Sequence, residues 1–293
     1  MAVLPNAFPA SFDQPVAKWP RVSMPANAAF RAAATWEEYK LGEYHTTTIT
    51  KEIALVARLR GHHHEVELRV TPPFLQKDGP EPLEELALRL AVLYEWVVEV
   101  GPLGQPLALL NAEAVQHRWE ELKTDLRRIS SPDDEITSYL IIYLDQQVRA
   151  PSNLLNSLQF DYLYLTLFTL LKTPPIDDAG RTFPRFFENF ALSFSEQLTH
   201  TSTEAPSLTT LVVRGTLDSQ RTDVPAITQH IASALAAVRP SAPVDAALAA
   251  HFGYQATYVL TEATGLPERV EMTVYARLAE QYNKEYTLLL TRL

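Results

Sequence analysis

Residues 86–100 read LALRLAVLYEWVVEV, with an apolar side chain at every second position. The alternating apolar set is Leu86, Leu88, Leu90, Val92, Tyr94, Trp96, Val98 and Val100. Successive side chains of a β-strand point to opposite faces of a sheet, so this period of two predicts a long strand with one buried face. We therefore expect a large β-rich body whose core receives the even-numbered side chains of this strand.

The same alternation returns near the end of the chain. Its apolar sets are Tyr254, Ala256, Tyr258 and Leu260 before the turn Thr264-Gly265-Leu266-Pro267, and Val270, Met272, Val274 and Ala276 after it. The stretch from Tyr254 to Ala276 is similar to bacterial envelope proteins of the lipoprotein-carrier type. That resemblance implies a half-barrel wrapped on helices, and it implies no functional residue. A final strand is expected over residues 286–293.

Shorter signals complete an N-terminal antiparallel meander. The β-branched run at residues 46–50 favours a strand over Trp36–Leu59, and Gly61 marks the turn into a return strand at Val66–Val70. A short strand is expected at Leu107–Leu110. Further strands are expected over Phe183–Leu198 and Leu208–Leu217.

Helices are predicted between these strands. Asn111 is a suitable N-cap for a helix that reaches Ile129, and Ser131 for a second that ends near Ala150. A third is expected to run to Leu171, although a buried strand over Tyr162–Leu170 fits the same apolar run. Residues 224–238 form another amphipathic pattern.

These elements predict an α+β fold, in which a strongly curved antiparallel sheet of half-barrel-like meanders packs on a cluster of about four helices. The expected organisation is a Pro-rich extended arm (1–34), a β-meander (35–110), a helical segment (111–172) and a β-rich segment with one helix (183–293). We expect residues 35–293 to form a single compact domain.

Composition limits the classes of function. Asp and Glu number 35 against 25 Lys and Arg, for a net charge of −10, which argues against nucleic acid as a partner. The chain has no cysteine, so disulfides and thiolate chemistry are excluded. The apolar run Phe160–Leu171 is too short for a transmembrane helix, and none is predicted. The N-terminus lacks the pattern of an export signal, so the expected location is the cytoplasm, or the periplasm if a signal has been removed.

No motif of catalysis or cofactor binding stands out. A strand through His62, His63 and His64 aims at most two imidazoles to one side, so we predict no metal ion and no cofactor. The nine glycines include no phosphate-binding loop, and Ser193 and Ser195 lack the glycines of a nucleophile elbow. The adjacent carboxylates at 84–85, 133–134 and 177–178 are expected to cap helices or face solvent.

Aromatic residues are the best candidates for binding. The low-entropy proline-rich arm carries Phe8, Phe12 and Trp19, and the predicted strands carry Trp36, Tyr94, Trp96, Tyr254 and Tyr258. The sequence favours a non-catalytic subunit of a larger bacterial assembly, related to the envelope or to secretion, with a protein partner or a second copy of itself. One alternative is a carrier of a small apolar or lipid-like ligand in the concave sheet, and another is a hydrolase whose site the sequence does not reveal.

Overall fold

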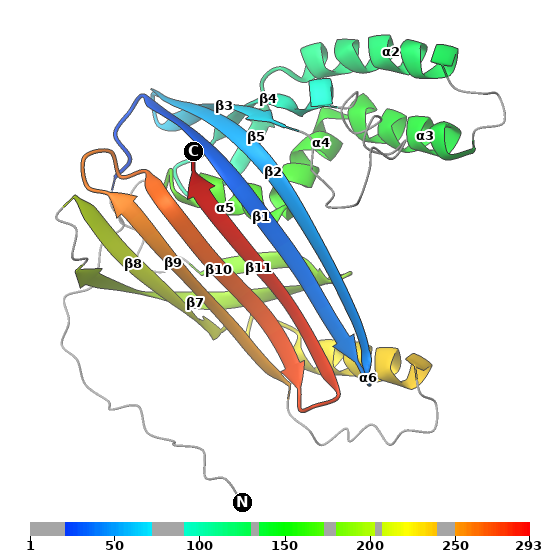
Figure 1. Ribbon diagram of the computed structural model, residues 1–293, viewed down its shortest axis with the longest axis vertical. Helices are drawn as coiled ribbons and strands as arrows, with labels where there is room; N and C mark the ends of the chain where they lie inside the picture. The colour runs from blue at the N-terminus through cyan, green and yellow to red at the C-terminus, as the bar shows by residue number, and fades with distance from the viewer. Residues whose placement is uncertain (1–20, 72–90, 130–134, 173–179, 203–206, 239–249) are drawn as a thin grey trace, which may run out of the picture.

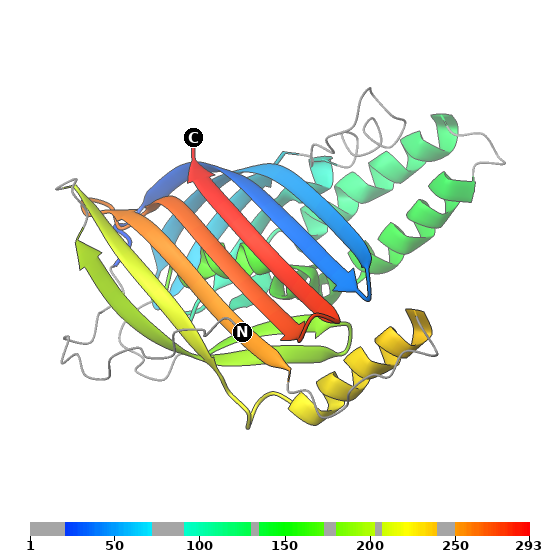
Figure 2. The same cartoon turned by 60° about the horizontal axis from the view of Figure 1, so that its bottom comes forward.

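The computed structural model describes residues 21–71, 91–129, 135–172, 180–202, 207–238 and 250–293. Within these residues, eleven strands form one antiparallel sheet in the order β5-β4-β3-β2-β1-β11-β10-β9-β8-β7-β6. The sheet is strongly curved and does not close on itself (Figures 1 and 2). With the helices, it confirms the predicted α+β fold.

The sheet has two halves, each made of neighbouring strands, and the pairing of β1 with β11 joins them. The first half contains β1 (Ala26–Lys40), β2 (Glu43–Arg60), β3 (His63–Val70), β4 (Glu95–Val100) and β5 (Pro106–Leu109). The second contains β6 (Arg181–Phe187), β7 (Phe190–Ser202), β8 (Leu208–Leu217), β9 (His251–Thr261), β10 (Pro267–Leu278) and β11 (Tyr282–Arg292). Strands β1 and β11 pair from Phe30 opposite Arg292 to Lys40 opposite Tyr282.

The helices lie between the strands in the chain. Helices α2 (Ala112–Ile129), α3 (Glu135–Arg149), α4 (Pro151–Phe160) and α5 (Tyr162–Thr169) separate β5 from β6, and α6 (Val224–Val238) separates β8 from β9. Helix α5 lies inside the curve of the sheet, whereas α2 and α3 form a hairpin that projects from it (Figures 1 and 2). The sheet and α5 therefore enclose the core.

The alternating apolar residues of the strands face this core, as predicted. On β4 the even-numbered Trp96, Val98 and Val100 are buried, and on β10 the even-numbered residues from Val270 to Leu278 are buried. Almost every side chain of α5 is also buried, because the helix meets the concave face of the sheet. Its apolar character on all sides follows from that position.

The prediction of one strand over residues 86–100 is wrong for its middle part. Residues 91–94 form a 3₁₀ turn, η1, and only Glu95–Val100 is strand; residues 86–90 lie outside the described part of the chain. Strand β3 pairs Arg69 with Glu95 and ends at Val70. Strand β3 therefore does not extend far enough to pair with residues 91–94, and the ladder ends at Glu95.

Three other strand predictions also need correction. Strand β1 begins at Ala26, inside the predicted arm (1–34), because the alanine-rich stretch after Pro25 pairs with both β2 and β11. The single strand predicted over Trp36–Leu59 is a hairpin that turns at Leu41 and Gly42, both of positive φ. In the same way, the predicted strand Phe183–Leu198 spans parts of two strands, β6 and β7.

The helical prediction differs from the structure at Asp161 and at Asn111. The third helix is two helices, α4 and α5, and the alternative of a strand over Tyr162–Leu170 is wrong. The Asn111 side chain does not cap α2: its Oδ1 accepts from Val97 N at 2.9 Å and its Nδ2 donates to the Glu95 carbonyl at 3.0 Å. It therefore ties the start of α2 to β4. The adjacent carboxylate pairs at 84–85, 133–134 and 177–178 lie outside the described residues.

Two leucines on β11 test the burial of the concave face. Leu290 is fully buried, whereas its neighbour Leu289 is 39% exposed. We expect Leu290→Ala to lower the free energy of unfolding by about 2–5 kcal/mol, because it leaves a cavity, and Leu289→Ala to lower it by about 0.5 kcal/mol or less. Urea unfolding of both variants measures the difference, and equal losses would contradict the assigned faces.

The carboxylate of Asp145 links helix α3 to helix α2. Asp145 on α3 accepts hydrogen bonds from Lys123 Nζ at 2.8 Å and Trp119 Nε1 at 3.0 Å, both on α2. These donors, Lys123 foremost, lower the pKa of Asp145 from 3.8 to about 2. A carboxylate with a depressed pKa stabilises the folded state above its unfolded pKa and loses that effect as the pH falls.

The pH dependence of an Asp145 variant follows from this shift. We expect Asp145→Asn to be less stable than the parent at neutral pH, and the difference to shrink as the pH falls from about 4 towards 2. Denaturant unfolding across that range measures it. Asp125→Asn, at an exposed surface pair on α2, serves as the control and should change little at any pH. A constant loss for Asp145→Asn at all pH values would show that its charge is not responsible.

Candidate functional site

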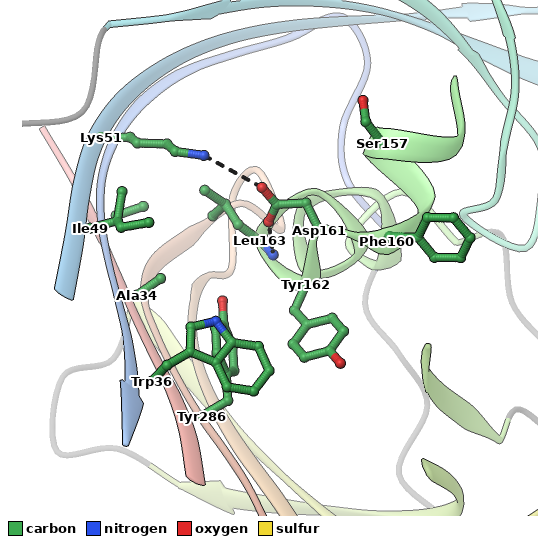
Figure 3. Close-up of a pocket in the computed structure, with 11 residues that line it drawn as sticks. Ala34, Trp36, Ile49, Lys51, Ser157, Phe160, Asp161, Tyr162, Leu163 and Tyr286 are labelled. Atoms are coloured by element: carbon green, nitrogen blue, oxygen red, sulfur yellow. Dashed lines mark hydrogen bonds and ion pairs between the residues drawn. The ribbon is translucent and has the colours of Figure 1, made fainter. Parts of the chain in front are cut away.

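A cavity of about 280 Å³ lies between the inner face of the sheet and the junction of α4 with α5 (Figure 3). Strands β1, β2 and β11 line it with Ala32, Ala34, Trp36, Ile49, Lys51 and Tyr286. The helices contribute Ser157 and residues 160–163. It is a pocket at the centre of the curved sheet, where the two halves meet.

Small side chains on β1 explain why space remains here. Ala32 and Ala34 occupy two successive inward positions between the larger Phe30 and Trp36. The opposite wall turns away at Asp161, whose extended backbone ends α4 and begins α5. Because neither wall supplies a large side chain at this level, the pocket is not filled.

Aromatic rings form one wall of the pocket. The Trp36 ring lies 4.8 Å from Tyr286, 5.5 Å from Tyr162 and 5.6 Å from Phe186, measured between centroids. The Tyr162 hydroxyl donates to the Pro184 carbonyl at 2.8 Å. Burial raises the pKa of Tyr162 and of Tyr286 far above the usual value, so both remain neutral. This wall is therefore apolar and held in place by mutual contacts.

The two charged residues that line the pocket form an ion pair. Lys51 Nζ lies 3.4 Å from Asp161 Oδ2, as the dashed line in Figure 3 marks. Asp161 Oδ1 accepts from Leu163 N at 2.9 Å and so caps α5. The Lys51 side chain is 22% exposed. The carboxylate is fixed by the helix it caps, while the ammonium has a long contact to that carboxylate and lies 5.7 Å from the centroid of the Tyr164 ring.

The pocket also contains a hydroxyl, which bears on the possibility of a hydrolase. Ser157 Oγ donates to the Leu154 carbonyl at 2.6 Å, within its own helix. Lys51, the basic group among the lining residues, is paired with Asp161 instead. A serine nucleophile needs a base that accepts its proton, and the contacts described for Ser157 engage its hydroxyl elsewhere.

A second polar cluster lies in the core under the other half of the sheet. Arg181 on β6 is 6% exposed, and its Nη1 donates to the hydroxyls of Tyr258 at 3.1 Å and Tyr254 at 3.2 Å. Its Nη2 donates to Thr166 Oγ1 on α5 at 2.7 Å. The Tyr254 hydroxyl in turn donates to Glu196 Oε1 at 3.0 Å. Four elements of structure, β6, β7, β9 and α5, are joined by this network.

Neutral tyrosines make the network possible. Burial raises the pKa of both Tyr254 and Tyr258, so each keeps its proton and can accept a hydrogen bond from the guanidinium. Burial disfavours the charge on Arg181, but Tyr254, Tyr258 and Glu196 outweigh it and raise the pKa of Arg181. Arg181 therefore stays charged, with Tyr254 linking it to the carboxylate of Glu196.

The structure separates the aromatic residues that were predicted to bind. Trp36 lines the pocket, whereas Tyr254 and Tyr258 belong to the Arg181 network. Tyr94 on η1 contacts Trp96 at 5.7 Å, away from the lining of the pocket. Trp96 packs on Tyr164 of α5 at 5.4 Å. The three arm residues, Phe8, Phe12 and Trp19, lie outside the described part of the chain.

Of the residues that line the pocket, the predicted set contains Trp36 alone. The lining residues that it lacks include Lys51, Asp161, Tyr162 and Tyr286. Asp161 carries a signal in the sequence, since it is the acidic residue that interrupts an apolar run, and Tyr286 begins the predicted last strand. Lys51 carries no signal, because a lysine in a strand is ordinarily solvated. Its role follows from the position of β2 opposite Asp161.

The histidines near Gly61 are placed on different sides of β3. His64 is buried, and burial lowers its pKa, whereas His63 Nδ1 lies 2.9 Å from Glu99 Oε1. In the part of the chain that the structure describes, no three His, Cys, Asp or Glu residues group together as metal ligands would. The absence of a metal ion and of a cofactor stays a prediction.

Comparisons with known proteins add no assignment, because no family model matches the chain and no curated protein matches it either. Among the described residues, no helix combines the length and the apolar character needed to cross a membrane. The pocket is therefore the feature of the molecule from which a function is inferred.

Substitutions of Asp161 can distinguish the contribution of the helix cap to stability from that of the ion pair with Lys51. We expect Asp161→Ala to lower the free energy of unfolding by about 1–2 kcal/mol, because α5 loses its N-cap. Asp161→Asn keeps an acceptor for Leu163 N and should cost less. Thermal or urea unfolding compares the two variants, and an Asn variant as unstable as the Ala variant would show that the charge, and not the cap, is what matters.

Proposed function

We propose that this chain is a non-catalytic binding protein that holds a small apolar or lipid-like molecule, with an anionic head group, in the pocket between β1, β2 and the α4–α5 junction. The observation that carries this proposal is the 280 Å³ cavity inside the curved sheet, with an aromatic wall and one ammonium group among its lining residues. Ligand sites are commonly concave and mainly apolar, with a few polar groups that orient the ligand.

The size of the cavity supports a small ligand. A cavity of about 150 Å³ lined by apolar side chains holds one benzene molecule. The pocket here has nearly twice that volume, at about 280 Å³. A medium-length alkyl chain or a small ring system matches it, whereas a whole phospholipid does not.

The Lys51–Asp161 pair supports an anionic head group. Charge-assisted N–H···O bonds are usually about 2.7–2.9 Å long, and this one is 3.4 Å. A lysine ammonium has three donors, so a ligand carboxylate can bind Lys51 while Asp161 keeps its bond to Leu163 N. The head group would then lie beside Lys51 and the apolar part against Trp36.

Binding is favoured over hydrolysis by the state of the polar groups. Ser157 donates within its helix and Lys51 is bound to Asp161, so the described contacts assemble no nucleophile with a base. An apolar pocket with one charged rim orients a ligand without attacking it.

The role in an assembly, which the sequence favoured, stays a prediction. It depends on the arm, and Phe8, Phe12 and Trp19 lie outside the described residues. The structure describes where this arm joins the body: Ser23 N donates to the Thr264 carbonyl at 2.8 Å, in the turn between β9 and β10.

Filling the pocket tests the proposal. Decanoate should bind to the parent protein. The Ala34→Phe substitution should lower the affinity for decanoate at least tenfold, because the new ring occupies the cavity. Ala33→Phe places the same ring on the other face of β1 and is the matched control. Isothermal titration calorimetry measures the affinities, and thermal melting confirms that both variants fold.

The head group is tested with a second pair of measurements. Lys51→Met should lower the affinity for decanoate, which is anionic, and leave the affinity for neutral decanol unchanged. Equal binding of decanoate to the parent and to Ala34→Phe would contradict the pocket as the site. A loss of both ligands in Lys51→Met would contradict the anionic head group alone.

A further inference from the structure

Helix α3 carries an exposed apolar stripe. Tyr139 is 72% exposed, Ile142 is 59% exposed and Tyr143 is 49% exposed. These positions are three and four residues apart, so they lie on one face of the helix. The opposite face, with Ile141 and Val148, is buried against the body. Large apolar side chains gathered on one exposed face mark interaction surfaces.

Charged residues stand at the two ends of this stripe. Glu135 and Arg149 lie seven residues before and seven residues after Ile142, so all three share one face of α3. Both side chains are exposed, and Arg149 also pairs with Asp145 at 2.5 Å. Because arginine has five donors, this pair leaves further donors for a second carboxylate.

We propose that α3 packs in antiparallel orientation against α3 of a second copy of this chain. A two-fold axis at Ile142 stacks the two isoleucines and places Glu135 of each copy opposite Arg149 of the other. A two-fold interface needs a patch that is complementary to itself, and an acid, an apolar centre and a base in this order meet that requirement. This charge complementarity favours a second copy over an unrelated partner.

The position of α3 permits this contact. The α2–α3 hairpin projects from the sheet, so α3 can meet a second copy without obstruction by the curved sheet (Figure 1). The interface is small, because one helix face buries less than the roughly 1,600 Å² of a standard interface. The chain's net charge of −10 also repels a second copy. We therefore expect a concentration-dependent dimer with a dissociation constant in the micromolar range.

Sedimentation velocity of the full chain tests the dimer. Between about 1 and 200 μM at 0.15 M salt, which screens the net repulsion, the parent should change from monomer to dimer. Ile142→Glu should remain monomeric without a change in melting temperature, since its side chain is exposed. Leu59→Glu, at a 55% exposed leucine of β2, is the matched control and should dimerise as the parent does.

Charge reversal tests the antiparallel orientation. Glu135→Arg and Arg149→Glu each create two like-charge pairs in the symmetric dimer, and each should weaken it about tenfold. A mixture of the two single variants should form a heterodimer of at least parental affinity, because every end pair is then opposite in charge. Each chain in the mixture keeps its substitution, so a loss of dimerisation caused by damage to α3 itself would not be restored by mixing.

Each outcome bears on the proposal. A parent that stays monomeric over the whole range overturns it, and so does a dimer that Ile142→Glu does not disturb. A dimer that Ile142→Glu abolishes, but that the mixture of charge-reversed variants does not restore, overturns the antiparallel arrangement. The pocket proposal is unaffected by any of these results, because it uses other residues.

Discussion

The pairing of β1 with β11 is the interaction on which the rest of this structure depends. It joins the two ends of the described chain, from Phe30 opposite Arg292 to Lys40 opposite Tyr282. Every other strand pairs with a neighbour in the chain or with the next strand across a helical insertion. Without this ladder the protein would be two separate sheets, each with an additional unprotected edge. Since its partners are more than 240 residues apart, the ladder has a high cost in chain entropy and is expected to form late in folding.

The pocket exists because of that ladder. Trp36 on β1 and Tyr286 on β11 are direct partners in it, and together they form the aromatic wall. Ala34, the next inward residue on β1, leaves the space that neither β2 nor the α4–α5 junction fills. Sheet curvature brings these strands around α5, and the break at Asp161 stops the helix from closing the space. The same contact that unites the two halves of the sheet therefore also builds the proposed ligand site.

Patterns in the sequence predict the parts of the fold that are local. Alternation predicts β9 and β10 and the buried face of β4, and helical spacing predicts α6 with its observed bounds. The alanine-rich start of β1 has little strand propensity of its own, so its state depends on partners far away in the chain. For the pocket, Trp36 is predictable as an inward aromatic residue. Lys51 and Asp161 are not predictable as a pair, because nothing local relates a lysine on β2 to a helix N-cap.

Arg181 and Lys51 are two of the positive charges that face the interior of this protein, beside Lys172 and Lys284, and their surroundings differ. Arg181 is buried and satisfied by Thr166, Tyr254 and Tyr258, so losing one of these partners would leave a buried N–H donor of a charged group unpaired, which is costly. Lys51 is partly exposed, lies over the Tyr164 ring, and has a long contact to a carboxylate that is independently fixed by α5. Exchanging that contact for a ligand's anionic group costs little. Arg181 therefore links β6, β9 and α5, and Lys51 is the cation in the pocket lining that we propose for ligand recognition.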